Sequence, residues 1–376
     1  MLGDEERSAV DQVLRGSTLT HGPRVQEFEA GLAAFTEAPH AIAVATCAAG
    51  LHLACLAMEL GPGDEVLVPA QTHVAMAHAV EACGARPVFW DCELETGNVD
   101  LALLEGLVTD RTRAISVVHY LGRPVDMDPI VAFARMRQLV VVEDCAIALG
   151  ATYRGIHVGL HGDIGCFSFY PVKHITTGEG GAVLTRDEEL ARRISSQRAF
   201  GIDRHVVAER RHGGSYDVEY LGLNYRMGEV PAALGVVQLK GLADVLAVRE
   251  RNFEALSTAL DGVRGIRVLD SGHGPHHRSS HYCLVAVLDD ELVPRRSEIV
   301  ERMQERGVGT SVYYPKALPD LSYYSRRYDA AGSCPNASRI SDGSIALPVG
   351  PHVEEQDIET IASALAGAVE AVAAHV

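Results

Sequence analysis

Short apolar runs alternate with longer stretches of helical periodicity between residues 41 and 185, and this alternation limits the folds open to the chain. Helical stretches cover 49–60, 72–83, 100–107 and 128–136, after two earlier helices at 8–15 and 25–36. The runs expected to form strands cover 41–45, 65–69, 86–90, 114–119, 139–143, 164–169 and 182–185. Continuous apolar strands separated by helices are typical of a parallel sheet covered on both faces. The pattern therefore predicts an α/β fold with a mainly parallel mixed sheet flanked by helices.

The pattern changes after residue 226. One long helix is expected over 229–260, followed by strand-like stretches at 266–269, 282–288 and 310–314. Further helices are expected at 296–306 and 354–372. This order predicts a large domain over 1–240 and a smaller C-terminal α+β domain over 241–376.

The composition restricts the partners of the chain. A formal charge of −17 disfavours nucleic acid, because phosphate backbones are bound by clustered Lys and Arg. The eight cysteines include no C-x-x-C pair, so neither a disulfide framework nor a zinc site is expected. The most apolar stretch, 41–60, is interrupted by polar residues, and the N-terminus is acidic. We expect a cytoplasmic protein that contacts no membrane and binds no metal.

One lysine has unusual neighbours. Lys173 stands between the aromatic, β-prone run 165–172 and a glycine-rich turn at 178–181. Glycines let the backbone approach a flat group closely. A lysine in such a pocket loses hydration, so its pKa falls and its neutral amine can attack a carbonyl. The alternative is a surface lysine before a loop. Residue type alone favours that alternative, whereas the rest of the chain argues against it.

Four other positions offer parts of a cofactor site, although each also has an ordinary structural explanation. Ala48 and Ala49 lie where a strand runs into a helix, and helix N-termini bind phosphate. Asp144 ends a strand at the carboxyl edge of the sheet, where an acid can hold a protonated ring nitrogen or cap a helix. His73 follows another strand, where its imidazole can stack on a flat ring. Ser168, five residues before Lys173, can donate to the same phosphate.

Together these residues supply the groups that a pyridoxal phosphate (PLP) site needs. The sequence around them also resembles a known family. It is similar to the DegT/DnrJ/EryC1/StrS sugar aminotransferases of fold type I over nearly its whole length. The specific stretches are GPGDEV at 61–66, PVF at 87–89, Glu143-Asp144, FSF at 167–169 with Lys173, TGEGG at 177–181 and GLNYRM at 222–227. As a combination they are far more specific than any one motif.

The resemblance implies roles for named residues. Lys173 would form the Schiff base with PLP and shuttle the proton, and Asp144 would pair with the pyridine nitrogen. His73 would stack on the ring, while Ala48, Ala49 and Ser168 would hold the phosphate. Asn224 would reach that phosphate from the other subunit of a homodimer.

The chain departs from the family pattern at three positions. The family often has Thr where Ala48 stands, Gln where Ile147 stands and His where Leu149 stands. The hydrogen bonds lost at the first two positions are expected to weaken cofactor binding by about 1–3 kcal/mol in total. We interpret the departures as variation within the family, because Lys173 and Asp144 are retained.

Candidate substrate contacts are less specific. Arg198, Arg204 and Arg211 lie in an arginine-rich segment and can meet a nucleotide pyrophosphate, although a solvated face explains most of these arginines. Tyr313 and Tyr314 lie where family members contact sugar. Four histidines at 273–281 are expected to form a surface loop and not a metal site.

The resemblance predicts amino transfer from glutamate or glutamine to a small-molecule keto sugar that is activated by dTDP, UDP or GDP and carries its ketone at carbon 3 or 4. A keto-cyclitol acceptor is an alternative that the sequence does not separate. A PLP-dependent sugar 3-dehydratase is disfavoured, because those relatives have histidine at the lysine position. A non-catalytic protein with the same fold is disfavoured by the joint presence of Lys173, Asp144 and Ser168.

Overall fold

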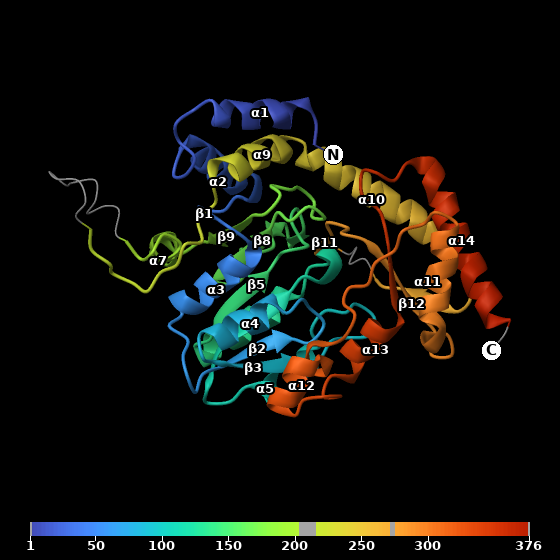
Figure 1. Ribbon diagram of the computed structural model, residues 1–376. Helices are drawn as coiled ribbons and strands as arrows, with labels where there is room; N and C mark the ends of the chain where they lie inside the picture. Colours follow the sequence, from blue (N-terminus) through green and yellow to red (C-terminus); the bar gives the residue numbers. More distant parts are fainter. Residues whose placement is uncertain (1, 203–215, 271–274, 375–376) are drawn as a thin grey trace.

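A central seven-stranded sheet organises the computed structural model, which describes residues 2–202, 216–270 and 275–374 (Figure 1). Its strands, in spatial order, are β1 (His40–Val44), β9 (Gly181–Thr185), β8 (Ile164–Ser168), β5 (Val140–Asp144), β4 (Thr112–Val118), β2 (Glu65–Pro69) and β3 (Arg86–Trp90). β3, β2, β4, β5 and β8 pair in parallel, whereas β9 is antiparallel to both β8 and β1. The predicted mainly parallel mixed sheet is confirmed, and each strand agrees with its expected range to within two residues.

Helices cover both faces of this sheet. One core combines α3 (Cys47–Ala57), α4 (Ala75–Ala82) and α7 (Glu188–Gln197) with one face. The opposite face packs against α2 (Pro23–Thr36), α6 (Met127–Arg137) and α9 (Glu229–Lys240). The other α-helices in the described stretches of this part are α1 (Asp4–Leu14), which packs on α9, and the short α5 (Leu104–Leu107). The loops that follow the parallel strands gather at the carboxyl edge of the sheet, which is where α/β sheets place their ligands.

A buried glutamate fastens the start of α2 to α9. Glu229 is 1% exposed, and its carboxylate accepts the backbone N–H groups of Gly22 at 3.0 Å, Arg24 at 2.9 Å and Val25 at 3.2 Å. These are donors that the first turn of a helix leaves without an intrahelical acceptor. One side chain therefore both caps α2 and connects it to a helix 200 residues away.

Replacing Glu229 by alanine is expected to lower the free energy of unfolding by about 2–4 kcal/mol, because buried backbone donors lose their acceptor. Denaturant unfolding followed by circular dichroism measures this loss. Glu27→Ala is the matched control on α2, since the one ion pair of Glu27 with the described residues is its surface pair with Arg24, and it should change stability by less than about 0.5 kcal/mol. Equal effects of the two substitutions would show that Glu229 is not a cap.

The prediction of a single long helix over 229–260 is wrong. Two helices, α9 and α10 (Leu242–Ala259), meet at Gly241 with a bend of 60°. Glycine is a weak helix former, which makes Gly241 a favourable place for the break. The bend allows α9 to pack on α1 and α2 while α10 packs on α14 (Glu355–Ala373).

The C-terminal part is built around a second, antiparallel sheet. Its strands are β10 (Ile266–Val268), β12 (Leu284–Leu288) and β13 (Ser344–Leu347), with β12 in the centre. α10, α11 (Arg296–Glu305) and α14 cover this sheet and share one core with it (Figure 1). A small third sheet joins β11 (His277–Arg278) to β6 (Thr152–Tyr153) and β7 (Ile156–His157). We propose Gly241 as the boundary between the two domains, because the helical direction changes there and Phe253, Leu256 and Leu260, farther along α10, belong to the C-terminal core.

The sequence pattern misplaced or missed several elements in this part. The stretch 310–314, expected as a strand, makes only an isolated bridge between Ser311 and Ala346. α12 (Ser322–Tyr328), α13 (Pro335–Gly343) and β13 were not predicted. α12 is short, and the buried Tyr324 joins it to the core of the large sheet, so distant contacts stabilise it more than local preference.

No single helix within the described ranges is long and apolar enough to cross a bilayer, although α9 and α10 together meet the length and composition despite their bend.

Candidate active site

The N-terminus of α3 forms a small cradle at the carboxyl edge of the sheet. Thr46 caps the helix by accepting the Ala49 N–H at 3.0 Å, and Ala48 is exposed beside it. A Cβ atom on Gly181 would lie 2.4 Å from the carbonyl carbon of Thr46. The absence of a side chain there lets β9 lie directly against the helix start. The predicted positions Ala48 and Ala49 thus lie at a helix N-terminus suited to an anion.

Asp144 ends β5 at the same edge of the sheet. Its side chain is almost fully buried, and Oδ1 accepts the Ala146 N–H at 2.9 Å. Burial raises the pKa of this carboxyl, while the Ala146 N–H and the positive charge of Lys173 act to lower it. Among the described residues Oδ2 has no hydrogen-bond partner, so this oxygen is available to a cationic donor.

Glu143, the preceding residue, serves the opposite face of the strand. It is completely buried, and its two oxygens accept backbone N–H groups of residues 159, 161 and 162 and contact His119 Nε2 at 2.9 Å. Burial acts to raise the pKa of Glu143, but the hydrogen bond and charge of His119 outweigh it and hold the pKa low. His119, Glu143 and Cys145 lie close enough to suggest a metal site. The carboxylate is already occupied by four donors, and the group instead fixes the loop beneath β5.

Lys173 lies in a tight loop after β8. Its backbone N–H donates to Tyr170 O at 2.9 Å, and the Thr177 N–H donates to Phe169 O at 2.9 Å. The Nζ atom lies 5.2 Å from the centre of the Tyr282 ring. Burial lowers the pKa of Lys173, and the Asp144 carboxylate partly offsets this effect. The amine is therefore more readily neutral than that of an ordinary surface lysine.

His73 completes the predicted group. It follows β2, is partly exposed, and its ring centre lies 6.1 Å from that of Tyr314. Desolvation lowers the pKa of His73, the Asp144 carboxylate opposes this, and the Lys173 charge lowers it further. The structure thus brings His73, Asp144 and Lys173 within range of each other's charges. Ser168 ends β8 at the same edge, where its Oγ receives the Tyr170 N–H at 3.4 Å.

A buried amide that sequence reasoning missed connects this edge to the C-terminal part. Gln71 donates to Tyr120 Oη at 3.0 Å and to Tyr313 O at 3.0 Å, and it accepts from Ser341 Oγ at 2.9 Å. Tyr313 in turn contacts Tyr282 through their hydroxyls at 3.2 Å. The segment carrying Tyr313 and Tyr314 is thereby held against β2. In the sequence, the only sign of this role was that Gln71 stands two residues before His73.

Lys173 also lines a cleft of about 1060 Å³ between the two domains. The walls come from α1, from the loop before and after Lys173, from the α9–α10 junction and from the C-terminal part. Residues that carry polar or charged groups into it include Glu5, Lys173, Arg249, Tyr282, Thr310 and Tyr313. The cleft is large enough for a ligand in addition to a flat cofactor.

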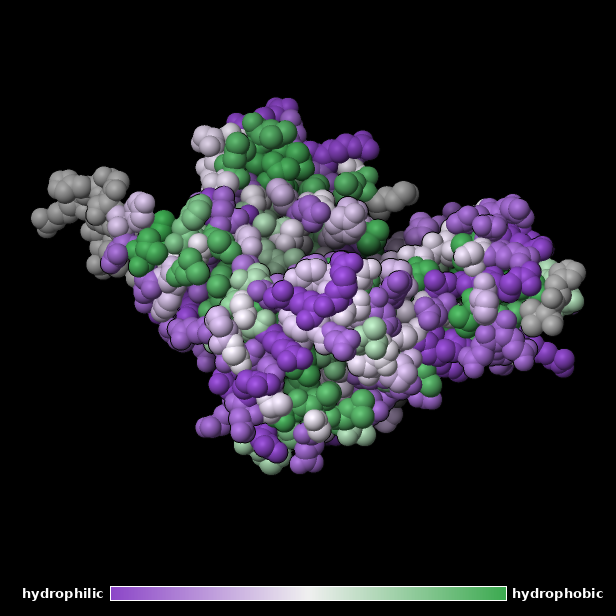
Figure 2. Space-filling view, turned by 60° about the horizontal axis from the view of Figure 1, so that its bottom comes forward, coloured by the Kyte–Doolittle hydropathy of each residue, from purple (hydrophilic) through white to green (hydrophobic). Residues whose placement is uncertain are grey.

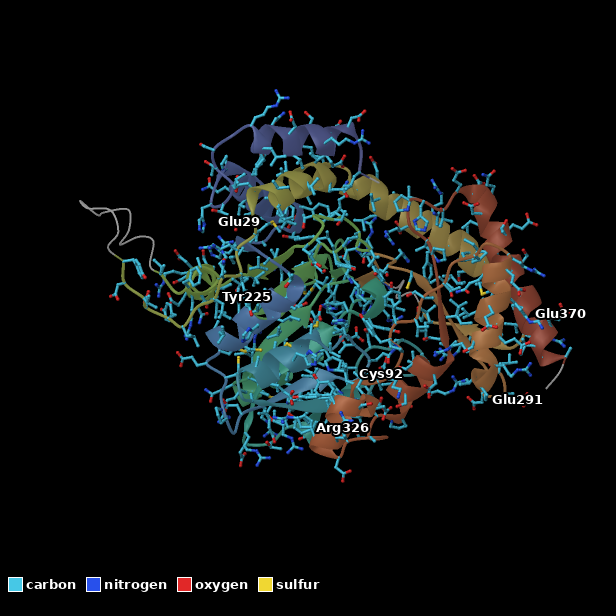
Figure 3. All side chains as sticks on the ribbon, viewed as in Figure 1. Glu29, Cys92, Tyr225, Glu291, Arg326 and Glu370 are labelled. Carbon is cyan, nitrogen blue, oxygen red and sulfur yellow. The ribbon has the colours of Figure 1, made fainter. Side chains whose placement is uncertain are left out.

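Of the predicted site residues that the structure describes, only Lys173 and Tyr313 line this cleft, and Asn224 and Arg198 also lie apart from the group formed by His73, Asp144 and Lys173. Asn224 is exposed beside the end of β1, where Tyr225 O accepts the Ala45 N–H at 2.7 Å and Tyr225 Oη contacts His52 Nδ1 at 3.0 Å. Figure 3 shows the neighbouring Tyr225 on the side of the molecule opposite Glu291 and Glu370 of the C-terminal part. Arg198 is mostly buried, and its guanidinium is engaged by Glu29 and by the Ala43 carbonyl. Its role in substrate binding remains a prediction. Arg204, Arg211 and His273 lie outside the described residues.

Ile147 and Leu149, two of the three departures from the family pattern, are buried in apolar cores. Ile147 shares its core with Tyr282, Tyr313 and Tyr314. An aliphatic residue here offers no hydrogen bond to a neighbouring ligand. Thr46 contributes a hydroxyl at the helix start, but that hydroxyl is used as the cap.

The lowered pKa of Lys173 gives a direct test. The chain has three lysines, Lys173, Lys240 and Lys316. In protein without bound PLP, acylation of Lys173 should begin at lower pH than that of Lys240 and Lys316, because only the neutral amine reacts. Mass spectrometry of the three lysine peptides across a pH series measures this with two internal references. Identical pH profiles for all three would contradict the structural environment described for Lys173.

Comparison with known proteins agrees with this geometry. The profile of the DegT/DnrJ/EryC1/StrS aminotransferase family matches residues 1–366. The spore coat polysaccharide biosynthesis protein SpsC of Bacillus subtilis is 35% identical over 370 residues, covering 97% of this chain and 94% of SpsC.

Solved structures match over almost the whole chain. The putative sugar aminotransferase Spr1654 of Streptococcus pneumoniae, in its PMP-form, has a TM-score of 0.94 at 26% identity and covers 99% of this chain and 98% of its own. PseC of Helicobacter pylori, an aminotransferase involved in pseudoaminic acid biosynthesis, has a TM-score of 0.91 at 26% identity with the same coverages. The fold type I architecture implied by the sequence is confirmed. The chain therefore belongs to the DegT/DnrJ/EryC1/StrS aminotransferase family and is a PLP-dependent sugar aminotransferase.

Proposed function

We propose that this enzyme transfers an amino group from glutamate or glutamine to a nucleotide-activated 3- or 4-keto-deoxysugar. The observation that carries the proposal is the meeting of a buried lysine amine, a buried carboxyl and a helix N-terminus at one edge of one sheet. Each is a group that PLP requires, and they come from β5, α3 and the loop after β8. All eight cysteines carry free thiols, which supports a reducing compartment such as the cytoplasm.

The residues present fit PLP. The Lys173 amine would bind the cofactor's aldehyde carbon, and Asp144 Oδ2 would accept the ring N–H. The N–H groups at the start of α3 and the Ser168 hydroxyl would hold the phosphate, and His73 would lie against the ring. The space left by Gly181 supports this assignment, because any side chain there would displace the helix start.

When bound, PLP supplies a ring that takes up the electron pair left when a proton is removed from the amino-bearing carbon. Lys173 Nζ would remove that proton and return it at the neighbouring position, acting as general base and then as general acid. Its lowered pKa favours the neutral form required for the first role. Asp144 would keep the ring nitrogen protonated, and its burial strengthens that interaction.

His174, the residue next to Lys173, gives no support to the alternative dehydratase reaction. His174 is buried, and its Nε2 contacts the Ser280 carbonyl at 3.0 Å. This carbonyl engages its imidazole, and Lys173 occupies the position at which the dehydratases have histidine. A keto-cyclitol acceptor remains the alternative within the same reaction, since the names of the relatives support sugars as a class and do not identify the nucleotide.

The proposal is tested by supplying the enzyme with glutamate or glutamine and a panel of acceptors. The panel contains 3-keto and 4-keto sugars bearing dTDP, UDP or GDP, together with keto-cyclitols, and products are identified by mass spectrometry. Amination of a nucleotide sugar is the expected result. Amination of a cyclitol alone would replace the proposed substrate class.

We also propose a homodimer in which Asn224 reaches the partner's phosphate site. Exposed apolar side chains around the Asn224 segment and the Lys173 loop support an interface, and they include Tyr170, Val172, Phe200, Tyr216, Val218 and Leu221. Figure 2 likewise shows hydrophobic residues gathered in separate patches on one face of the molecule. Closed two-fold dimers are the commonest soluble assemblies.

Mixing two inactive variants, Lys173→Ala and Asn224→Trp, is expected to restore about a quarter of the activity after subunit exchange. Random exchange makes half of the dimers mixed, and one site in each mixed dimer has both an intact lysine and an intact asparagine. Activity is measured against each variant alone, and exchange is proven by mixing tagged and untagged chains. Complete failure despite proven exchange would show that each site is built within one chain.

A further inference from the structure

Arg249 is a buried cation with no acidic partner. It lies on α10, is 7% exposed, and donates through Nη1 to the carbonyls of Tyr282 at 2.8 Å and His281 at 3.4 Å. Its buried Nε has no hydrogen-bond partner among the described residues. No carboxylate in the described ranges forms an ion pair with it, and burial lowers its pKa, opposed only by tyrosine and cysteine neighbours. Charged side chains this deeply buried are ordinarily paired.

This arginine shares the cleft of Lys173. Both residues line the same cavity of about 1060 Å³. The Tyr282 ring links them, since Lys173 Nζ lies 5.2 Å and Arg249 Cζ lies 6.0 Å from its centre. The remaining nitrogen, Nη2, makes no hydrogen bond with the described residues and borders Gly350 at the cleft wall. The Arg249 guanidinium, with nitrogens that have no partner among the described residues, and the Lys173 amine therefore lie near the same Tyr282 ring.

We propose that Arg249 binds a carboxylate of the amino donor, and this inference rests on the proposed aminotransferase function. A guanidinium presents parallel N–H donors whose spacing matches a carboxylate. The charged side chains of the cleft are nearly balanced, with Lys173, Lys240 and Arg249 set against Glu5 and Glu6. That balance suits a singly charged amino acid donor better than a diphosphate. The donor's carboxylate supplies the negative charge that no described side chain provides at Arg249.

The test separates this role from structural support. Arg249→Gln removes the charge, Arg249→Lys keeps the charge without the fork, and Arg251→Gln is the matched control. Arg251 is exposed two positions along the same helix, and its one hydrogen bond with the described residues is to Asn252 Oδ1 at 3.5 Å. Holoenzyme binding of glutarate, a dicarboxylate that carries no amine to transfer, is measured by calorimetry. KM values are measured separately for glutamate and for the keto sugar, and melting temperatures monitor folding.

We expect Arg249→Gln to weaken glutarate binding and raise the KM for glutamate by about 10- to 100-fold, as for the loss of a charge-assisted hydrogen bond. Arg249→Lys should fall between this variant and the wild type. The KM for the keto sugar and all constants of Arg251→Gln should change less than about threefold. If Arg249→Gln fails to fold, Arg249→Lys decides, since it must still weaken glutarate binding by more than threefold.

Unchanged glutarate affinity in a folded Arg249 variant would overturn the inference. So would a KM increase confined to the keto sugar, because the bound anion would then be a phosphate of the acceptor. Glutarate binding that depends on Arg249 in an enzyme that aminates none of the acceptors would support Arg249 and contradict the proposed substrate. The two proposals therefore fail in distinguishable ways.

Discussion

Replacing Lys173 by alanine is expected to lower the transamination rate at least ~1000-fold, equivalent to roughly 4 kcal/mol of transition-state stabilisation. The substitution removes two functions of one atom, because Nζ would both bind the cofactor's aldehyde carbon and move the proton. Lys240 and Lys316 are the chain's other lysines, and neither contributes to the charge environment of Asp144. The rate is measured with saturating donor and acceptor.

Two further variants make this prediction specific. Lys316→Ala is the matched control, since Lys316 is exposed and does not line the cleft, and its rate should stay within about twofold of wild type. Lys173→Arg keeps a positive charge at the site but has no readily neutral amine, so it should be as inactive as Lys173→Ala. Normal turnover by either Lys173 variant would remove this residue from the mechanism.

The central fold could be predicted from sequence because each strand of a two-sided sheet is itself a continuous apolar run. The ranges 65–69 and 86–90 were predicted without error as β2 and β3. The C-terminal part was harder, since α12 is only seven residues long and depends on contacts between Tyr324 and the distant large sheet. The break at Gly241 was hidden within a long apolar helical pattern, because one glycine does not by itself require a bend.

In the candidate site, too, some residues could be predicted from the local sequence and others could not. Lys173 and Asp144 adjoin strand ends at the carboxyl edge, so local pattern and family resemblance together were sufficient to find them. Gln71, Arg249 and Tyr282 act through partners that are 31 to 270 residues away, and no local pattern marks them. Arg249 illustrates the difficulty, since its sequence neighbours Glu250 and Arg251 suggest an ordinary charged helix face. Only packing shows that this guanidinium is buried without a counter-charge.

Asp144→Asn should reduce the rate at least ~100-fold, about 2.7 kcal/mol of transition-state stabilisation, while leaving the protein folded. Asparagine retains an oxygen that can accept the Ala146 N–H, so the local geometry is preserved. It carries no charge to keep the ring nitrogen protonated, so the electron pair is taken up less readily. Single-turnover absorbance changes with glutamate measure this loss without requiring the acceptor.

Stability distinguishes this role from that of a structural acid. Burial raises the pKa of Asp144, so the folded state disfavours its charged form, and a neutral isostere should not lower the free energy of unfolding at neutral pH. Glu143 is the reverse case, because its pKa is held low by His119 and by backbone donors. Glu143→Gln should therefore destabilise the protein by about 2–4 kcal/mol, and that stabilisation in the wild type should fade as pH falls through the lowered pKa of Glu143. A rate change below threefold for Asp144→Asn, or a stability loss matching that of Glu143→Gln, would identify Asp144 as a core acid.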